Sequence, residues 1–299
     1  EVVKAHQDLR VFATMNPSSY EGRKDLSAAM MDRFKKKIWV DQLPPEEMVQ
    51  VVKATDIANG LVGNWSNDPK WLDKLKTASP TAFESAQQAE AQGYKEKDQM
   101  FAAALALANK VVTGNHDEDP PTNAEKQMVN SIPQKLDDKV LMSLAMFHSK
   151  IAAMCEKREL GKKGGPYPFT LRDMLKLTQR VDNDRKTNPN ANPQQLLWRH
   201  SVDLYVNRFM SDVDRDRVTD QLGVALFGTK ANRPGLTVTG DAKFDDKNCT
   251  IGDVNLPVNQ LDPNNKDNSY IPKINPNFTW TASTVDKVAA LARSVKLDE

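Results

Sequence analysis

A short apolar run near the start of this 299-residue chain places the strongest constraint on its fold. Residues 11–15 (Val-Phe-Ala-Thr-Met) have the length and the β-forming content of a strand that is buried on both faces. Asn16 and Pro17 end this run, because proline cannot donate to a sheet ladder and restricts the residue before it. A polar amide therefore stands at the carboxyl end of a buried strand, which is where ligands bind in open parallel sheets.

The residues after Asn16 continue an α/β pattern. A loop that contains Gly22 leads into a short helical stretch over 26–34, and a second strand-like run follows over 37–40. This order of strand, polar tip, loop, helix and strand predicts an α/β unit rather than a helical bundle. Taken alone, Asn16 could simply cap the strand through an Asx turn, and Arg33 could be a surface residue beside a basic run.

An ordered set of short motifs carries a family resemblance. The motifs are Phe-Ala-Thr-Met-Asn-Pro at 12–17, Gly-Arg at 22–23, Leu-Ser at 26–27 and Asp-Arg-Phe at 32–34. Together they resemble the second half of an AAA+ ATPase core, of the branch that holds midasin, dynein-type rings and MoxR-like ATPases. In that family the Asn at the strand tip is sensor 1, which orients the water that attacks the γ-phosphate of ATP. The resemblance implies this role for Asn16.

Two arginines in the same region match a further functional position of the family. The Arg of the family's Arg-Phe pair is the arginine finger, which reaches the nucleotide of the neighbouring module. The resemblance places this catalytic contact, made in trans, on Arg33, with Arg23 as the alternative finger. It implies the remnant of an α/β P-loop NTPase core over residues 1–43, followed by a mostly α-helical lid over 44–222.

The first lid helix is expected to begin at residues 44–47 (Pro-Pro-Glu-Glu), because proline suits the first helical turn and acids oppose the helix dipole. Turn-forming residues at 59–60 and 63–65 then weaken the helical pattern. We therefore interpret residues 59–135 as a family-variable insertion within the lid. Helical spacing predicts further helices at about 71–75, 80–91, 98–112, 136–160, 194–210 and 212–222.

A chain break at 164–168 (Gly-Gly-Pro-Tyr-Pro) precedes a new helix that begins near Phe169. Thr170 is a good N-cap, and Asp173 stands at the third position of the first turn, as in a capping box. In the preceding helix, His148 lies on the apolar stripe, and a core position is more typical of such a histidine than a catalytic one.

The start of the helix after this break also resembles midasin-like modules, whose lid carries sensor 2 at the position of residues 169–181. The resemblance gives this role to Arg172, which would reach the γ-phosphate of ATP bound by the same module. The chemistry fits, because a planar and permanently charged guanidinium binds phosphate oxygens in bidentate fashion. The alternative is an ordinary surface arginine that pairs with Asp173 or Asp182.

The composition changes after residue 222. Segments at 236–240 and 250–254 have strand character with turn residues between them, and they predict a linker with a small β hairpin over 223–275. Residues 276–299 are expected to hold a capped amphipathic helix.

Within this last segment, Ser283 and Asp286 make a start that is similar to a capping box. The helix resembles the one that precedes the first strand and phosphate loop of an AAA+ module. The resemblance therefore implies the threshold of a following module on the same polypeptide.

The bulk composition excludes several function classes. A formal net charge of +1 argues against direct nucleic-acid binding, which usually requires a basic excess. The sequence has no apolar run long enough for a membrane span. Two cysteines without paired spacing suit a reducing compartment, so we expect an intracellular protein, cytoplasmic or, if it is of the eukaryotic midasin type, nuclear. His116, Asp117 and Asp119 lie in a Pro-flanked loop and are interpreted as solvated, so no metal site is predicted.

The residues that normally bind the phosphates and magnesium of ATP are missing from the sequence. No G-x-x-x-x-G-K-[ST] loop occurs, and the strand-like run at 37–40 is followed by a single acid, Asp41. The chain opens at Glu1 without Met, and we expect it to be part of a longer protein. ATP and Mg²⁺ are therefore expected only when Walker A and Walker B residues are present, and the chain alone is predicted to be inactive.

The functional prediction is part of a multi-module AAA+ ATPase that couples ATP binding and hydrolysis to the remodelling of a macromolecular complex. Its expected partners are neighbouring AAA+ modules in a ring. The alternative is a non-hydrolysing module that serves as a spacer or as a partner-binding arm of such a ring. Whether the parent module hydrolyses ATP, and which complex it remodels, stay open at this point.

Overall fold

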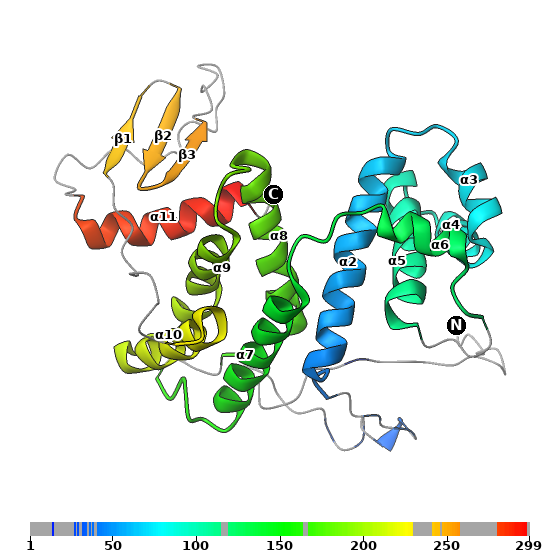
Figure 1. Ribbon diagram of the computed structural model, residues 1–299. Helices are drawn as coiled ribbons and strands as arrows, with labels where there is room; N and C mark the ends of the chain where they lie inside the picture. Colours follow the sequence, from blue (N-terminus) through cyan, green and yellow to red (C-terminus); the bar gives the residue numbers. More distant parts are fainter. Residues whose placement is uncertain are drawn as a thin grey trace, which may run out of the picture.

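The computed structural model describes residues 41–114, 119–163, 167–229, 241–245, 247–257 and 280–297, together with single residues between 14 and 38. These residues are mostly helical, and a small antiparallel sheet lies near the C-terminal end (Figure 1). The predicted α/β unit over 1–43 falls almost entirely outside the described residues. None of the helices in the described ranges combines the length and apolarity that a membrane span requires.

The element bounds follow the predicted helices closely in most places. The helices are α2 (Pro45–Trp65), α3 (Trp71–Ala78), α4 (Pro80–Ala91), α5 (Glu96–Thr113), α6 (Asn123–Asn130), α7 (Asp138–Glu156), α8 (Leu171–Thr187), α9 (Pro193–Ser201), the π-helix η1 (Val202–Val206), α10 (Asp212–Phe227) and α11 (Ala282–Leu297). The strands are β1 (Ala242–Phe244), β2 (Asn248–Ile251) and β3 (Val254–Pro257), paired antiparallel in the order β1-β2-β3.

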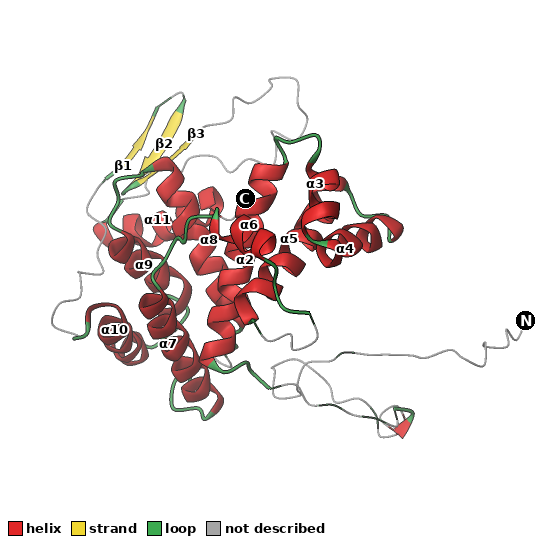
Figure 2. Cartoon of the chain, turned by 45° about the vertical axis from the view of Figure 1, so that its right-hand side comes forward, coloured by secondary structure: helices red, strands yellow, loops and turns green. Residues whose placement is uncertain are grey.

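Helix α2 takes part in two separate hydrophobic cores. Its first half buries Met48, Val49 and Val52 against α7–α10. Its second half, including Leu61 and Trp65, packs with α3–α6. Figures 1 and 2 show these two helix groups on opposite sides of α2. The second core is built from the residues of the proposed insertion, although its variability within a family stays a prediction.

The turn predicted at Asn59-Gly60 and Gly63-Asn64-Trp65 is wrong, because α2 continues unbroken to Trp65. The reason lies in packing: a Cβ atom on Gly60 would stand 2.5 Å from the Cγ2 atom of Ile132. Glycine at this position allows the segment after α6 to approach the helix closely. Tertiary contact thus overrides the local preference of an Asn-Gly pair.

The two glycines of α2 form a matched pair of test sites. In Gly63→Ala the new methyl group meets no atom within 4 Å. Because alanine has the higher helix propensity, we expect the free energy of unfolding to rise by about 0.5–1 kcal/mol. In Gly60→Ala the clash with Ile132 should reverse that gain and cost about 1 kcal/mol or more. Urea denaturation of both variants measures the difference, and equal effects would contradict the close packing of Ile132 on α2.

A cluster of charged groups lies where the two cores meet. Lys135, in the connection between α6 and α7, bonds to Asp182 of α8 at 3.1 Å and lies 3.9 Å from the carboxylate of Asp56 on α2. Burial raises the pKa of Asp56 to about 6, with Lys135 lowering it and Asp182 raising it by smaller amounts. Ionised Asp56 is therefore a source of instability above that pH.

Asp56→Asn should stabilise the protein at neutral pH. The folded-state pKa of about 6 lies above the unfolded value of 3.8, so the wild type loses stability as the pH rises from about 4 to 6. The full difference corresponds to at most about 3 kcal/mol, which the variant should regain at pH 7.5 and not at pH 4. Urea titrations of both proteins across this range measure it; a gain that is the same at pH 4 and pH 7.5 would disprove the assignment.

The helix predicted over 194–210 is not a single α-helix. It begins as α9 and continues as η1, in which the backbone N–H of Asn207 donates to the carbonyl of Val202 at 2.9 Å. A π-turn accommodates one more residue than an α-turn, and such turns are frequent at functional sites. The local sequence gives no sign of this change. Asp203, the second residue of η1, bonds to Arg293 of α11 at 2.7 Å.

The C-terminal elements also depart from the predicted bounds. The segment at 250–254 is the end of β2, a turn at Gly252-Asp253, and the start of β3; the predicted strand at 236–240 lies outside the described residues. Helix α11 begins at Ala282, and its first turn is capped by the Thr281 hydroxyl, which accepts the backbone N–H of Thr284 at 3.2 Å. The predicted cap at Ser283 is therefore wrong by two residues.

The sheet rests on α11 and forms a third, small core. Ile251 of β2 packs with Val285 and Ala289 of α11. Figure 1 shows the sheet lying over α11, with α8 beside it. At its far end α11 is joined to α8, where Asn183 donates to the carbonyl of Leu297 at 3.1 Å. Helix α11 is thus docked on the lid helices, while its role as the start of another module stays a prediction.

Candidate functional site

The first turn of α8 carries the predicted sensor 2. Arg172 is exposed there and forms no ion pair or hydrogen bond with any residue that the structure describes. The two acids named above as alternative partners, Asp173 and Asp182, are bonded to other cations. Asp173 bonds to Arg208 at 3.0 Å, and Asp182 bonds to Lys135 at 3.1 Å and to Lys186 at 2.9 Å. The guanidinium of Arg172 is therefore available to an anionic ligand.

The predicted capping interaction at this helix start is confirmed. The carboxylate of Asp173 accepts the backbone N–H of Thr170 at 2.8 Å and the Thr170 hydroxyl at 3.4 Å. These bonds satisfy one backbone donor at the end of the helix and fix the direction in which the first turn begins. The residue next to Asp173 is Arg172, so the cap also sets the place of that side chain.

An aromatic cluster packs around the residues that immediately precede α8. The ring of Phe169 is stacked on Tyr205 of η1 at 5.2 Å between centroids and lies 5.9 Å from Phe209. Tyr167 contacts Phe209 at 4.9 Å. Phe169, Tyr205 and Phe209 are nearly fully buried, so the aromatic cluster is tightly packed and holds the start of α8 in place. The segment before α8 is therefore held by the residues in and after η1.

His148 is buried within this aromatic cluster. Its side chain is fully buried, and Nδ1 lies 2.8 Å from the Tyr205 hydroxyl. Burial lowers the pKa of His148 to about 4, and burial also raises the pKa of Tyr205. Both groups are therefore neutral at physiological pH. Their hydrogen bond positions Tyr205 beneath Phe169.

One contact joins this helix start to the segment that enters α2. The side-chain amide of Gln42 donates to the carbonyl of Phe169 at 3.0 Å. Residues 41–44, which connect to the region of the predicted core, thus run past the beginning of α8.

The other predicted site residues cannot be placed in relation to Arg172. Asn16 and Arg23 lie outside the described residues. Arg33 is described and exposed, and no contact is observed between it and Arg172. The geometry therefore concerns Arg172 alone among the predicted site residues. Of the residues around the Pro-flanked acidic loop, Asp119 is engaged by Lys110 at 2.7 Å, and His116 and Asp117 lie outside the described ranges.

Sequence reasoning missed a buried ion-pair network between η1, the β2–β3 turn and α11. Arg293 bonds to Asp203 at 2.7 Å and to Asp253 at 2.7 Å, and Arg199 bonds to the same Asp253 at 2.8 Å. The side chains of Arg293 and Asp203 are only 5% and 4% exposed. The sequence did indicate that Arg293 could be buried, because it lies four residues after Ala289 on the apolar stripe of α11.

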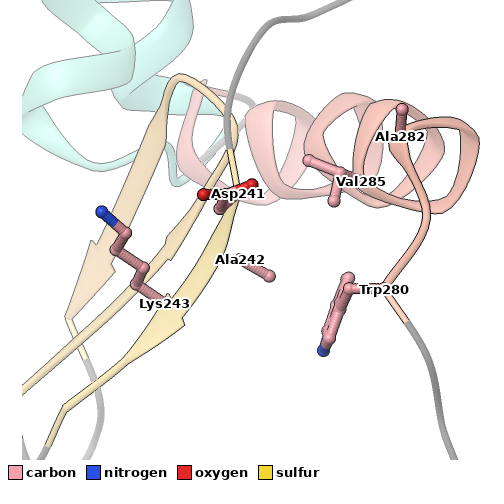
Figure 3. A pocket seen from close by; sticks show the side chains of 6 residues that line it. All are labelled: Asp241, Ala242, Lys243, Trp280, Ala282 and Val285. Carbon is pink, nitrogen blue, oxygen red and sulfur yellow. The ribbon is translucent and has the colours of Figure 1, made fainter.

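A pocket of about 400 Å³ lies between β1 and the start of α11 (Figure 3). The ring of Trp280 at its mouth lies 5.6 Å from that of Phe244, and both residues are partly or largely exposed. Within the described part of the chain, no group of three potential metal ligands lies at this pocket or elsewhere. The pocket is lined by Asp241, Ala242, Lys243, Trp280, Ala282 and Val285.

One family model matches the region around α8. Residues 126–226 match the midasin AAA lid domain. The matched residues run from α6 to the end of α10 and include Arg172, Arg208 and the aromatic cluster. A search of solved structures found no match. This part of the chain is therefore similar to the midasin AAA lid domain, and such a lid is part of an AAA+ ATPase module.

Proposed function

We propose that this chain is the lid, with flanking segments, of one module in a multi-module AAA+ ATPase ring, and that Arg172 is its sensor 2. In this role the guanidinium of Arg172 binds the γ-phosphate of ATP held by the preceding core. The ring couples ATP hydrolysis to the remodelling of a macromolecular complex. The neighbouring modules are its partners, on the same polypeptide.

This proposal rests on one observation: Arg172 is exposed and has no acidic partner among the described residues, in a region similar to the midasin lid. The side chain is exposed at the N-terminal end of a 17-residue helix, and the acids near it are bonded to other cations. The positive end of the helix dipole adds to the charge of the guanidinium at this point. Arg172 itself pairs with neither Asp173 nor Asp182.

The residues present fit the phosphate end of ATP but not its metal. Arg172 offers a free cation with five N–H donors, which suits phosphate oxygens. The described ranges contain no cluster of carboxylates that could hold Mg²⁺. We therefore assign the metal and the inner phosphates to Walker residues outside this sequence. Asn16 is proposed as sensor 1 and Arg33, or alternatively Arg23, as the arginine finger of a neighbouring nucleotide.

In this scheme the chain contributes electrostatic stabilisation rather than a covalent step. Charge develops on the γ-phosphoryl oxygens as the bond to the leaving phosphate breaks, and a prepositioned guanidinium stabilises that charge. The aromatic cluster and the capped first turn hold the backbone of Arg172 in place. Asn16 would hold the attacking water in place, so that the water and the leaving group are aligned.

Arg172→Ala tests the proposal in a longer protein that joins this chain to an intact phosphate-binding core. We expect kcat for ATP hydrolysis to fall on the order of 100-fold, because one preorganised donor to the transition state is lost. Arg172→Lys should recover only part of the rate, since an ammonium cannot bind in bidentate fashion. Arg217→Ala, an exposed arginine of α10, is the matched control.

The outcome separates the two functions considered for the ring. A normal kcat for Arg172→Ala would overturn the sensor role. No hydrolysis by the longer wild-type protein, despite bound ATP, would favour a non-hydrolysing structural module. The 299-residue chain alone should show no turnover, and clear turnover by the purified chain would contradict the assignment of the Walker residues to another segment.

A further inference from the structure

Arg208 contacts the start of α8 on both sides of its N-cap. Its Nη1 atom lies 3.0 Å from Oδ1 of Asp173 and donates to the carbonyl of Pro168 at 3.4 Å. Its guanidinium carbon lies 4.9 Å from the centre of the Phe169 ring. One side chain, carried by the turn after η1, therefore joins the segment before the helix to the first turn of the helix itself.

Both carboxylate oxygens of Asp173 accept hydrogen bonds. Arg208 donates to Oδ1, and the backbone N–H and the hydroxyl of Thr170 donate to Oδ2. The Asp173 side chain is 15% exposed. Among the described residues, Arg208 is the cationic partner of this carboxylate. Arg172 directly precedes Asp173 in the sequence.

We propose that Arg208 is a positioning residue for Arg172, and this inference rests on the proposed sensor role. Arg208 neutralises Asp173 and clamps the first turn of α8, which leaves the guanidinium of Arg172 free for phosphate. Residues next to each other in a helix do not face one another, so capture of Arg172 by Asp173 requires the first turn to distort. The clamp opposes that distortion.

A purely structural role for Arg208 would have a different signature. Phe169, Tyr205 and Phe209 are each no more than 2% exposed and pack around the start of α8 without the help of Arg208. Arg208 itself is 38% exposed, and half-exposed ion pairs contribute little to stability. Loss of Arg208 should therefore leave the lid folded. The effect should appear in the behaviour of Arg172.

A double-mutant cycle in the longer protein tests the link between the two arginines. Arg208→Ala should lower kcat roughly tenfold, because Arg172 is misplaced. In the Arg172→Ala background the same substitution should cause no further loss, since its effect acts through Arg172. Arg208→Lys should restore part of the rate by keeping a cation beside Asp173. An unchanged kcat in Arg208→Ala, or additive losses in the double variant, would overturn the proposal.

Hydrogen exchange on the 299-residue chain gives a readout that needs no nucleotide. In Arg208→Ala the amides of residues 170–174 should exchange at least threefold faster, whereas those of α10 should keep their wild-type rates. Arg217→Ala is the control, and it should leave residues 170–174 unchanged. Equal exchange in the Arg208 variant and the wild type would disprove the clamp. If only the clamp is confirmed and Arg172→Ala hydrolyses ATP normally, the proposed sensor role fails instead.

Discussion

Arg293→Ala is expected to destabilise the protein by about 3–5 kcal/mol, the largest effect among the substitutions considered. The substitution leaves the carboxylate of Asp203, which is 4% exposed, without its cation in the interior. It also removes the bond between α11 and Asp253 of the β2–β3 turn. Chemical denaturation measures the loss. We expect α11 and the sheet to be affected most, because Arg293 joins both to η1.

Arg199→Ala provides a matched control for this experiment. Arg199 bonds to the same Asp253 at 2.8 Å, but its side chain is 40% exposed. Exposed ion pairs contribute about 1 kcal/mol or less, so this variant should be nearly as stable as the wild type. A second variant, Arg293→Met with Asp203→Leu, removes both buried charges and should recover most of the lost stability. Equal effects of Arg293→Ala and Arg199→Ala would contradict the buried network.

Lys110→Met should have the second-largest effect, about 3 kcal/mol, and should act in the core formed by α3–α6. The Nζ atom of Lys110 lies 3.2 Å from the carboxylate of Glu125, whose side chain is fully buried. Ser79 donates to the same carboxylate at 2.6 Å, and the backbone N–H of Thr122 at 2.7 Å. These donors remain in the variant, so the loss lies at the lower end of the range for a broken buried pair.

Two further substitutions separate charge from packing at this site. Lys126→Met changes an exposed lysine of α6 and should alter stability by no more than about 0.5 kcal/mol. Glu125→Gln added to Lys110→Met removes the orphaned charge and should restore part of the stability. Thermal denaturation of the three proteins measures these differences. A double variant less stable than Lys110→Met would show that Glu125 does not carry the cost.

Most helices of the described residues could be predicted from the sequence. The apolar stripe of α7, with Leu144, Phe147 and Ile151 all buried, follows directly from the 3.6-residue period. The capping pair Thr170 and Asp173 was also legible, because caps use residues only three positions apart. These features depend only on residues close together in the sequence, so they can be predicted from it.

The features that failed depend on residues distant in sequence. Gly60 lies within α2, and Ile132 packs close to where its Cβ atom would stand, a contact that no local pattern reports. The π-turn of η1 differs from an α-turn by one residue, which is too small a change for a periodic pattern to register. The partner of Arg293 lies 90 residues away in Asp203. Nothing near either residue indicated that the two charges meet.

The sequence by itself determined the helical lid and its resemblance to midasin-type modules, and it singled out Arg172 as a candidate for phosphate binding. Only the tertiary structure decided that this arginine is available, because Asp173 bonds to Arg208 after η1 and Asp182 bonds to Lys135 before α7. It also decided that α2 serves two cores and that α11 is fixed to η1. The physical reason is the same in each case: helix formation follows from local spacing, whereas burial and charge pairing depend on which distant segments pack together.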